Sequence, residues 1–165
     1  HSKTESVYVI DGTQTDAKGV YPTGTVYFNP PGSGHQIMNS SGFFVLAYAS
    51  PPDFMSTDLI GEYTPVRIET GAMGDYDFEE QVSGVMAYEV PLLEEGGMSG
   101  RFFEIEAGAE AFDFTGNYVL VLEGRCDIGG VPVAAQTLVV TKGVEPEAFT
   151  LSASAETCRA MGVSF

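Results

Sequence analysis

The sequence predicts an all-β protein built as an antiparallel β-sandwich, with a closed β-barrel as the second choice of architecture. Short runs of β-type residues are separated by turn clusters rich in Gly and Pro along most of the 165 residues. No long stretch carries apolar residues at the spacing of an α-helix. Several strands at this spacing, with turns between them, are typical of two packed antiparallel sheets.

The expected strands follow from composition and alternation. In chain order they cover residues 6–10, 24–29, 42–49, 63–69, 82–90, 101–107, 117–126, 131–141 and 149–151. Within residues 82–90, apolar Met86 and charged Glu89 fall on opposite faces, so one face of this strand is expected to meet the core.

Residues 118–122 differ from the other runs because they have no polar side. This pattern predicts a central strand that is covered on both faces. The turn at residues 127–130 ends in two glycines and predicts a hairpin to residues 131–141. Pro132 cannot donate a ladder hydrogen bond, so the start of the second arm is expected at a sheet edge.

The C-terminal tail carries the one helical signal. Ser154 can cap a short helical turn through Met161, and Gly162 can end it. We expect residues 1–165 to form a single β-sandwich domain, with residues 145–165 as a C-terminal extension. A chain of this length can bury roughly 70% of its unfolded surface without metal or disulfide support.

Cys126 and Cys158 are the only cysteines. Two are too few for a disulfide-rich scaffold or an all-cysteine zinc site. A single bridge between the C-terminal segment and the sheet is one alternative. Two independent buried thiols are the favoured one, because free cysteine is among the most buried residue types.

The charge balance and the hydropathy pattern each exclude one class of partner. Seven Lys and Arg residues face 23 Asp and Glu residues, which gives a formal net charge of −16. Binding to a phosphate backbone depends on clustered basic residues, and here they are dispersed, so nucleic acid is not an expected partner. No apolar run approaches the ~20 residues that span a bilayer, so membrane insertion is not expected either.

The sequence offers little for nucleophilic catalysis. The chain has two histidines, of which His1 is terminal and His35 lies in a Pro- and Gly-rich loop where a solvated side chain is the ordinary case. We therefore expect no catalytic residues. A hydrolase that uses two carboxylates stays open as an alternative, because 23 acids always contain some pair.

No cofactor is expected, with calcium as the one candidate ligand. Asp75, Asp77 and Glu79 place several oxygen ligands in one loop, and residues 11–16 offer a second such cluster. Neither segment matches an EF-hand loop, and a chain this acidic is expected to contain clusters by chance.

Two segments are long for hairpin loops and combine aromatic or large apolar residues with acids. Residues 50–62 contain Phe54 and Met55, and residues 70–81 contain Tyr76 and Phe78. Aromatic anchors ringed by charge are usual in contact surfaces, so these four residues are predicted to bind a partner. The alternative is that the same side chains cover the ends of the sandwich.

Three segments resemble immunoglobulin-like sandwich domains of bacteriophage virion proteins: residues 84–88, 103–105 and 114–122. In the last of these, Gly116 and Tyr118 stand at the start of a strand. The resemblance implies an immunoglobulin-like or jelly-roll-like sandwich without catalytic residues. It implies a non-enzymatic virion component of a tail, baseplate or capsid decoration. Such a protein would contact other structural subunits in an oligomeric assembly, in a virion or extracellular location. A secreted or cell-surface module that binds carbohydrate or protein, and a carboxylate-based hydrolase, remain as alternatives.

Overall fold

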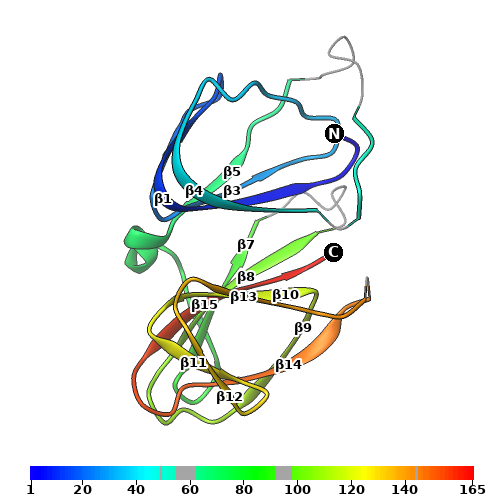
Figure 1. The fold of residues 1–165 in the computed structure, drawn as a ribbon. Helices are drawn as coiled ribbons and strands as arrows, with labels where there is room; N and C mark the ends of the chain where they lie inside the picture. The colour runs from blue at the N-terminus through cyan, green and yellow to red at the C-terminus, as the bar shows by residue number, and fades with distance from the viewer. Residues whose placement is uncertain (49, 55–61, 92–97, 144) are drawn as a thin grey trace. The chain divides into compact units, whose positions relative to one another are not determined.

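The computed structural model describes residues 1–48, 50–54, 62–91, 98–143 and 145–165. Their contacts divide the chain into two compact units: unit 1 lies within residues 1–73, and unit 2 comprises residues 74–91 and 98–165 (Figure 1). All strand pairs are antiparallel, and the one helix among the described residues is a 3₁₀ helix, Thr70–Asp75. The all-β prediction is confirmed. No helix in this part of the chain is long and apolar enough to cross a membrane.

Unit 1 contains one sheet organised around its first strand. Its strands are β1 (Glu5–Thr15), β2 (Val20–Pro22), β3 (Thr25–Asn29), β4 (Asn39–Tyr48) and β5 (Val66–Glu69). β1 pairs along one side with β4. On its other side the beginning of β1 pairs with β3 and its end pairs with β2, while β5 pairs with β3. β1 therefore orders the whole sheet.

β1 and β4 approach each other most closely at two glycines. Gly12 (φ +81°) lies opposite Gly42 (φ +86°), next to an irregularity in the register of β1. A Cβ atom on Gly12 would lie 2.0 Å from the carbonyl oxygen of Ser41. The glycines let the long β1 continue past residue 10, where the sequence analysis ended the strand.

The inner face of unit 1 follows from alternation along β1. Val7 and Val9 are buried in a cluster with Tyr21 and Tyr27. Glu5 has the same parity as these two valines, so its side chain belongs to the same face of the strand. A carboxylate is thereby directed to the interior of unit 1.

Unit 2 contains two sheets. One has six strands in the order β13-β10-β15-β8-β7-β6, and the other has four in the order β12-β11-β14-β9. The strands are β6 (Glu79–Val82), β7 (Val85–Val90), β8 (Ser99–Ile105), β9 (Phe112–Gly116), β10 (Tyr118–Glu123), β11 (Arg125–Ile128), β12 (Val131–Ala134), β13 (Thr137–Val140), β14 (Glu147–Ser152) and β15 (Cys158–Ser164).

The core of unit 2 lies between its two sheets. Phe103, Val119 and Val121 of the six-stranded sheet share one buried cluster with Phe149 and Leu151 of the four-stranded sheet. All five residues of the run 118–122 are buried, which confirms the predicted central strand.

The predicted hairpin is confirmed, and it also changes sheets. β11 and β12 meet through Gly129 and Gly130, both at positive φ, and β12 with Pro132 lies at a sheet edge as expected. Each arm, expected as one strand, divides in two. Gly124 (φ +68°) separates β10 from β11, and Gln136 (φ +62°) separates β12 from β13. These bends let one hairpin contribute to both sheets.

The prediction of a C-terminal helical turn is wrong. Residues 158–164 form β15, which lies between β8 and β10 and pairs with both. Residues 145–165 thus supply β14 and the inner strand β15. A short helix would give up both ladders, and tertiary pairing of this kind routinely overrides weak local propensity. The expectation that residues 1–165 form one domain stays a prediction.

The favoured assignment of two independent thiols is also corrected. Cys126 of β11 and Cys158 of β15 form a disulfide across the two sheets, with both side chains fully buried. Cys158 lies opposite β11 because residues 158–164 form β15. The helical turn expected there from the sequence gave no reason to place Cys158 beside Cys126.

Leu120 provides a test of the central strand. Replacing Leu120, which is 1% exposed, with Ala should lower the free energy of unfolding by about 2 to 5 kcal/mol in urea titrations. Leu138, its cross-strand neighbour, is 36% exposed and is the matched control, with a much smaller expected loss. Equal losses for Leu120→Ala and Leu138→Ala would contradict the central placement of β10.

The disulfide closes a loop over 32 positions of sequence. Replacing both cysteines with Ala should therefore cost about 2 to 5 kcal/mol of stability, mainly because the unfolded chain is no longer constrained. The wild-type protein in reductant should unfold at the same urea concentration as the variant. Two free thiols in the unfolded, unreduced protein would show that the bridge is not formed.

Candidate functional site

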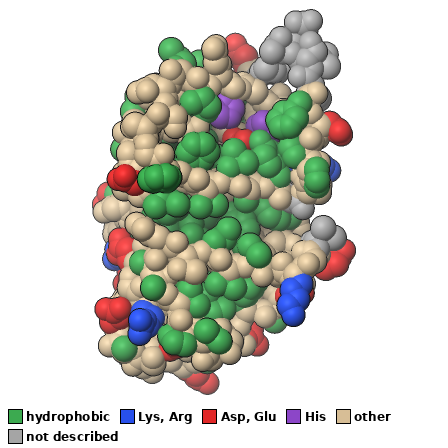
Figure 2. Space-filling model, in the orientation of Figure 1, with side chains coloured by type: hydrophobic (Ala, Val, Ile, Leu, Met, Phe, Trp, Pro, Cys, Tyr) green, Lys and Arg blue, Asp and Glu red, His purple; other side chains and the backbone are tan. Residues whose placement is uncertain are grey.

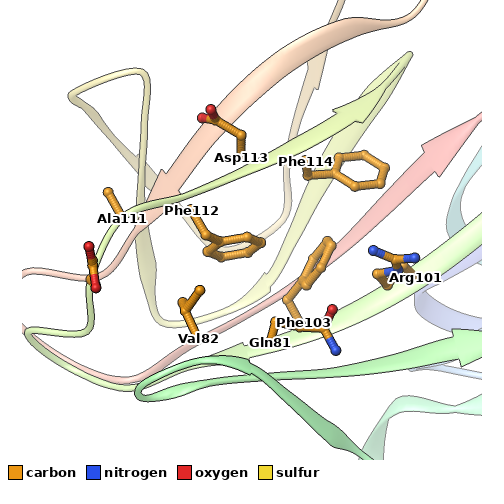
Figure 3. Close-up of a pocket in the computed structure, with 9 residues that line it drawn as sticks. Gln81, Val82, Arg101, Phe103, Ala111, Phe112, Asp113 and Phe114 are labelled. Atoms are coloured by element: carbon orange, nitrogen blue, oxygen red, sulfur yellow. The ribbon is translucent and has the colours of Figure 1, made fainter.

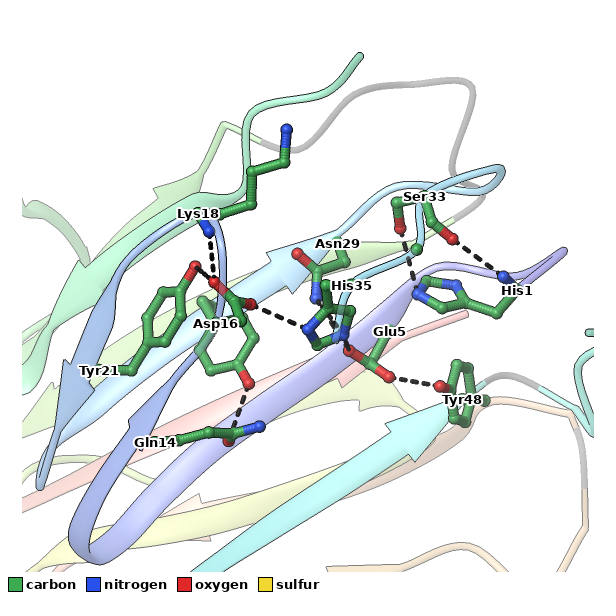
Figure 4. Close-up of polar contacts among 12 residues, drawn as sticks. His1, Glu5, Gln14, Asp16, Lys18, Tyr21, Asn29, Ser33, His35 and Tyr48 are labelled. Carbon is green, nitrogen blue, oxygen red and sulfur yellow. Dashed lines mark hydrogen bonds and ion pairs between the residues drawn. The ribbon is translucent and has the colours of Figure 1, made fainter. Parts of the chain in front are cut away.

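The register of unit 1 brings three polar side chains together. Glu5 is paired with Asn29 of β3 on one side and with Tyr48 of β4 on the other. Asn29 Nδ2 donates a hydrogen bond to Glu5 Oε1 over 2.8 Å, and the Tyr48 hydroxyl donates to Glu5 Oε2 (Figure 4). Both carboxylate oxygens are therefore held by the sheet itself.

His35 completes this cluster from the segment that follows β3. Its Nε2 atom lies 3.2 Å from Glu5 Oε1 and 3.5 Å from Asn29 Nδ2. Its Nδ1 atom lies 2.9 Å from Asp16 Oδ2. The side chain is only 10% exposed, so the sequence-based assignment of His35 as a solvated loop residue is wrong.

His1 lies near His35, with the centroids of the two rings 6.4 Å apart. His1 Nδ1 lies 2.7 Å from the Lys3 carbonyl oxygen, which can only accept a hydrogen bond, so Nδ1 is the protonated nitrogen of the neutral ring. His1 Nε2 then accepts from the Ser33 hydroxyl at 3.1 Å. The His1 ring also contacts Tyr48, with centroids 5.5 Å apart. Histidine and acidic side chains reach the surface side by side in the view of Figure 2.

Asp16 and a pair of stacked tyrosines support the site from the far end of β1. Asp16 follows the last residue of that strand, and its side chain is 1% exposed. Tyr21 and Tyr27 stack with centroids 4.1 Å apart, and the Tyr27 hydroxyl donates to Gln14 Oε1 at 2.9 Å. These contacts give the polar cluster a rigid, aromatic surrounding.

The electrostatics of the cluster favour an ionic pair. Burial alone would raise the pKa of Glu5, but hydrogen bonds from His35, Tyr48 and Asn29 outweigh it and lower that pKa below its ordinary value. The hydrogen bond with Glu5 raises the pKa of His35; burial opposes this shift, and the charges of Glu5 and Asp16 add to it. Burial, then the contact with Glu5, raises the pKa of Tyr48, so its hydroxyl keeps its proton.

Four observations indicate that these residues fit a transition-metal ion. His1, Glu5 and His35 each offer one ligand atom, and these atoms all lie within 4.8 Å of one another. Two imidazoles and one carboxylate are the donor set of mononuclear non-haem iron sites. Each imidazole has its Nδ1 atom against an oxygen acceptor, which is the usual arrangement for a histidine that binds metal through its other nitrogen. On His1, a metal ion at Nε2 would replace the hydrogen bond from the Ser33 hydroxyl. Asn29 Oδ1, buried and without a hydrogen-bond partner, adds an acceptor beside the cluster.

The residues predicted to bind calcium lie elsewhere. Asp75, Asp77 and Glu79 are exposed, and the described residues do not bring them into a cluster like that of His1, Glu5 and His35. Of the predicted contact residues, Tyr76 and Phe78 pack on Tyr88, with centroids 4.9 and 5.9 Å apart. Phe54 is 79% exposed, and Met55 lies outside the described residues. The calcium site and the partner-binding surface both stay predictions.

Unit 2 has a cavity of about 320 Å³ beside β8 and β9 (Figure 3). The rings of Phe103, Phe112 and Phe114 pack on one another along it, at centroid distances of 5.1 and 5.4 Å. Arg101, which borders this cavity, is paired with Glu89 at 2.8 Å. Two of the three rings are less than a tenth exposed, so the cavity offers little apolar surface to a ligand.

Sequence reasoning missed Glu5 and Asn29, placed Asp16 only in a candidate calcium cluster, and dismissed both histidines. One signal was available: Glu5 shares the parity of Val7 and Val9, so a charged residue follows the apolar face of a predicted strand. A buried charge must find partners, which marks a site. The pairing of β1 with β3 and β4, and the return of residue 35 to Glu5, have no local sequence signal.

Comparisons with known proteins identify the fold. No family model matches the sequence, and no curated protein matches it. The protein YlbA of E. coli is 15% identical, with a TM-score of 0.59, over 99% of this chain and 68% of that protein. A cupin 2 conserved barrel domain protein from Leptotrichia buccalis is 10% identical, with a TM-score of 0.59, over 98% and 73%. Quercetin 2,3-dioxygenase from Acinetobacter baumannii is 15% identical, with a TM-score of 0.52, over 99% and 65%.

These similarities correct the earlier interpretation. The resemblance to bacteriophage virion domains is wrong, because the similar structures are cupin-type proteins. The assignment as a non-enzymatic virion component is likewise overturned, since a dioxygenase is among them. Of the two sandwich types expected, the jelly-roll alternative fits and the immunoglobulin-like one is not confirmed. The chain has a cupin-like all-β fold, and it spans 65% to 73% of the length of the three similar structures.

Proposed function

We propose that unit 1 binds one divalent transition-metal ion through His1, Glu5 and His35, and that the site carries out oxygen-dependent chemistry on a small molecule. The observation that carries this proposal is that two imidazoles and one carboxylate come together at the inner face of the unit 1 sheet. Iron(II) is the first candidate, because this donor set is the one used by non-haem iron oxygenases.

The ligand chemistry argues against calcium at this place. Calcium takes six to eight oxygen ligands, whereas two of the three donors here are imidazole nitrogens. Imidazole suits iron, zinc, copper and nickel. The name of one similar structure, quercetin 2,3-dioxygenase, supports the oxygenase class over a purely structural metal.

In this proposal, His1, Glu5 and His35 would hold the iron(II) ion, which would supply the chemistry of dioxygen activation next to a substrate. The chain supplies orientation. Asn29 and Tyr48 each hold one oxygen of Glu5, so the carboxylate has a fixed direction. Tyr48 keeps its proton, and its half-buried hydroxyl can serve as a donor at the edge of the site.

The disulfide bears on location. Cys126 and Cys158 are buried in unit 2 and bridge its two sheets. Disulfides persist in oxidising compartments and are rare in the cytosol. This supports an extracellular or otherwise oxidising location for the protein.

Metal titration of matched variants tests the proposal. Wild-type protein should bind iron(II) under anaerobic conditions, as measured by isothermal titration calorimetry. Glu5→Gln should weaken binding by at least about 100-fold, since loss of a supporting group alone costs 10- to 100-fold. Asp11→Asn, at an exposed position of the same strand, is the control and should bind like wild type.

Two results would contradict the proposal. One is equal iron(II) affinity of wild type and Glu5→Gln, with both proteins folded by circular dichroism. The other is tighter binding of calcium than of iron(II), lost in Asp77→Asn and kept in Glu5→Gln. The second result would support the calcium prediction instead.

A further inference from the structure

The carboxylate of Asp16 is held by its own turn, independently of its contact with His35. Its Oδ1 atom accepts hydrogen bonds from the backbone amides of Lys18 at 2.7 Å and Gly19 at 3.0 Å. The Tyr21 hydroxyl adds a longer contact to the same oxygen at 3.4 Å. The local turn therefore uses Oδ1 and leaves Oδ2 directed at the imidazole (Figure 4).

Asp16 Oδ2 and His35 Nδ1 have each other as partners. They lie 2.9 Å apart, although the contact departs from hydrogen-bond geometry. Both atoms are buried, and neither has a hydrogen bond to any other described residue. Because the two atoms are 2.9 Å apart and neither is hydrogen-bonded to another described residue, their contact is the main polar interaction of each.

This contact has a consequence for the two ring nitrogens. Ionised carboxylates can only accept, and Glu5 Oε1 faces Nε2 just as Asp16 Oδ2 faces Nδ1, so the metal-free ring can carry its proton on either nitrogen. When a metal ion takes the place of the Nε2 proton, the remaining proton must lie on Nδ1, toward Asp16. The lone pair then belongs to Nε2, which lies 3.2 Å from Glu5 Oε1. The other tautomer would turn an N–H toward the position that a metal ion requires.

We propose that Asp16 is a positioning residue of the metal site, which fixes His35 in the tautomer that presents its Nε2 lone pair beside Glu5. The inference rests on the proposed metal-binding function of unit 1. It assigns a role to a residue that contacts neither metal nor substrate, and it explains why a buried acid is held by a dedicated turn at the end of β1.

The Asp16→Asn variant tests the tautomer directly. The amide oxygen of Asn can still accept from Lys18 and Gly19, while its NH₂ group faces His35 Nδ1 and donates to it. His35 should then lose its Nδ1–H population and be protonated at Nε2 alone, toward the Glu5 carboxylate. Nitrogen-15 NMR of the metal-free protein, above the titration of both imidazoles, measures this change. His1, whose Nδ1 contacts a backbone carbonyl, is the internal reference and should not change.

Metal affinity is the second readout. Asp16→Asn should lower iron(II) affinity by about 10- to 100-fold, and Asp16→Glu, which keeps an acceptor, should restore most of it. Asp11→Asn again serves as control. If Asp16→Asn does not fold, Asp16→Ser takes its place, because its hydroxyl oxygen can still accept from the turn amides while the oxygen that faces His35 is lost; it should lower iron(II) affinity likewise.

The outcomes separate the inference from the proposed function. If wild type binds metal and Asp16→Asn binds equally well with an unchanged His35 tautomer, Asp16 has no positioning role and the metal site stands. If wild type binds no metal, the proposed function fails. The role of Asp16 as a positioning residue then falls with it, even if the NMR comparison shows the tautomer switch.

Discussion

The burial of the Glu5 carboxylate is the constraint on which unit 1 depends. A buried carboxylate is costly unless each oxygen finds a donor. Here the donors come from the two strands that pair with β1, through Asn29 and Tyr48, and from the segment that places His35. A shift of either strand by one residue would turn the partner side chain to the other face and leave the charge unpaired. The site and the register of the sheet therefore specify each other.

The two ends of β1 place two carboxylates on either side of His35. The beginning of β1 supplies Glu5, and the residue after its end supplies Asp16, so the two carboxylates contact opposite nitrogens of the same imidazole. Buried valine and tyrosine side chains form a cluster on the inner face of this strand.

The sequence predicted most of unit 2 and little of the site. Alternation and the glycine pair identified the central strand and the hairpin with Pro132 at the edge, because these features are local. The tail was predicted as a helix because its local propensity is helical, whereas β15 is held by two neighbours distant in sequence. His35 was taken as solvated because its loop is rich in Pro and Gly. Its burial results from long-range contacts with Glu5 and Asp16, which no local pattern reveals.

The most direct test of the account is a crystal structure of the protein grown with iron(II) under anaerobic conditions, with an anomalous difference map at the iron edge. We expect one peak in unit 1, at about 2.0 to 2.2 Å from His35 Nε2, from an imidazole nitrogen of His1 and from a Glu5 oxygen, by analogy with nitrogen and oxygen ligands of zinc. A map without a peak there, or with its peak beside Asp75, Asp77 and Glu79, would contradict it.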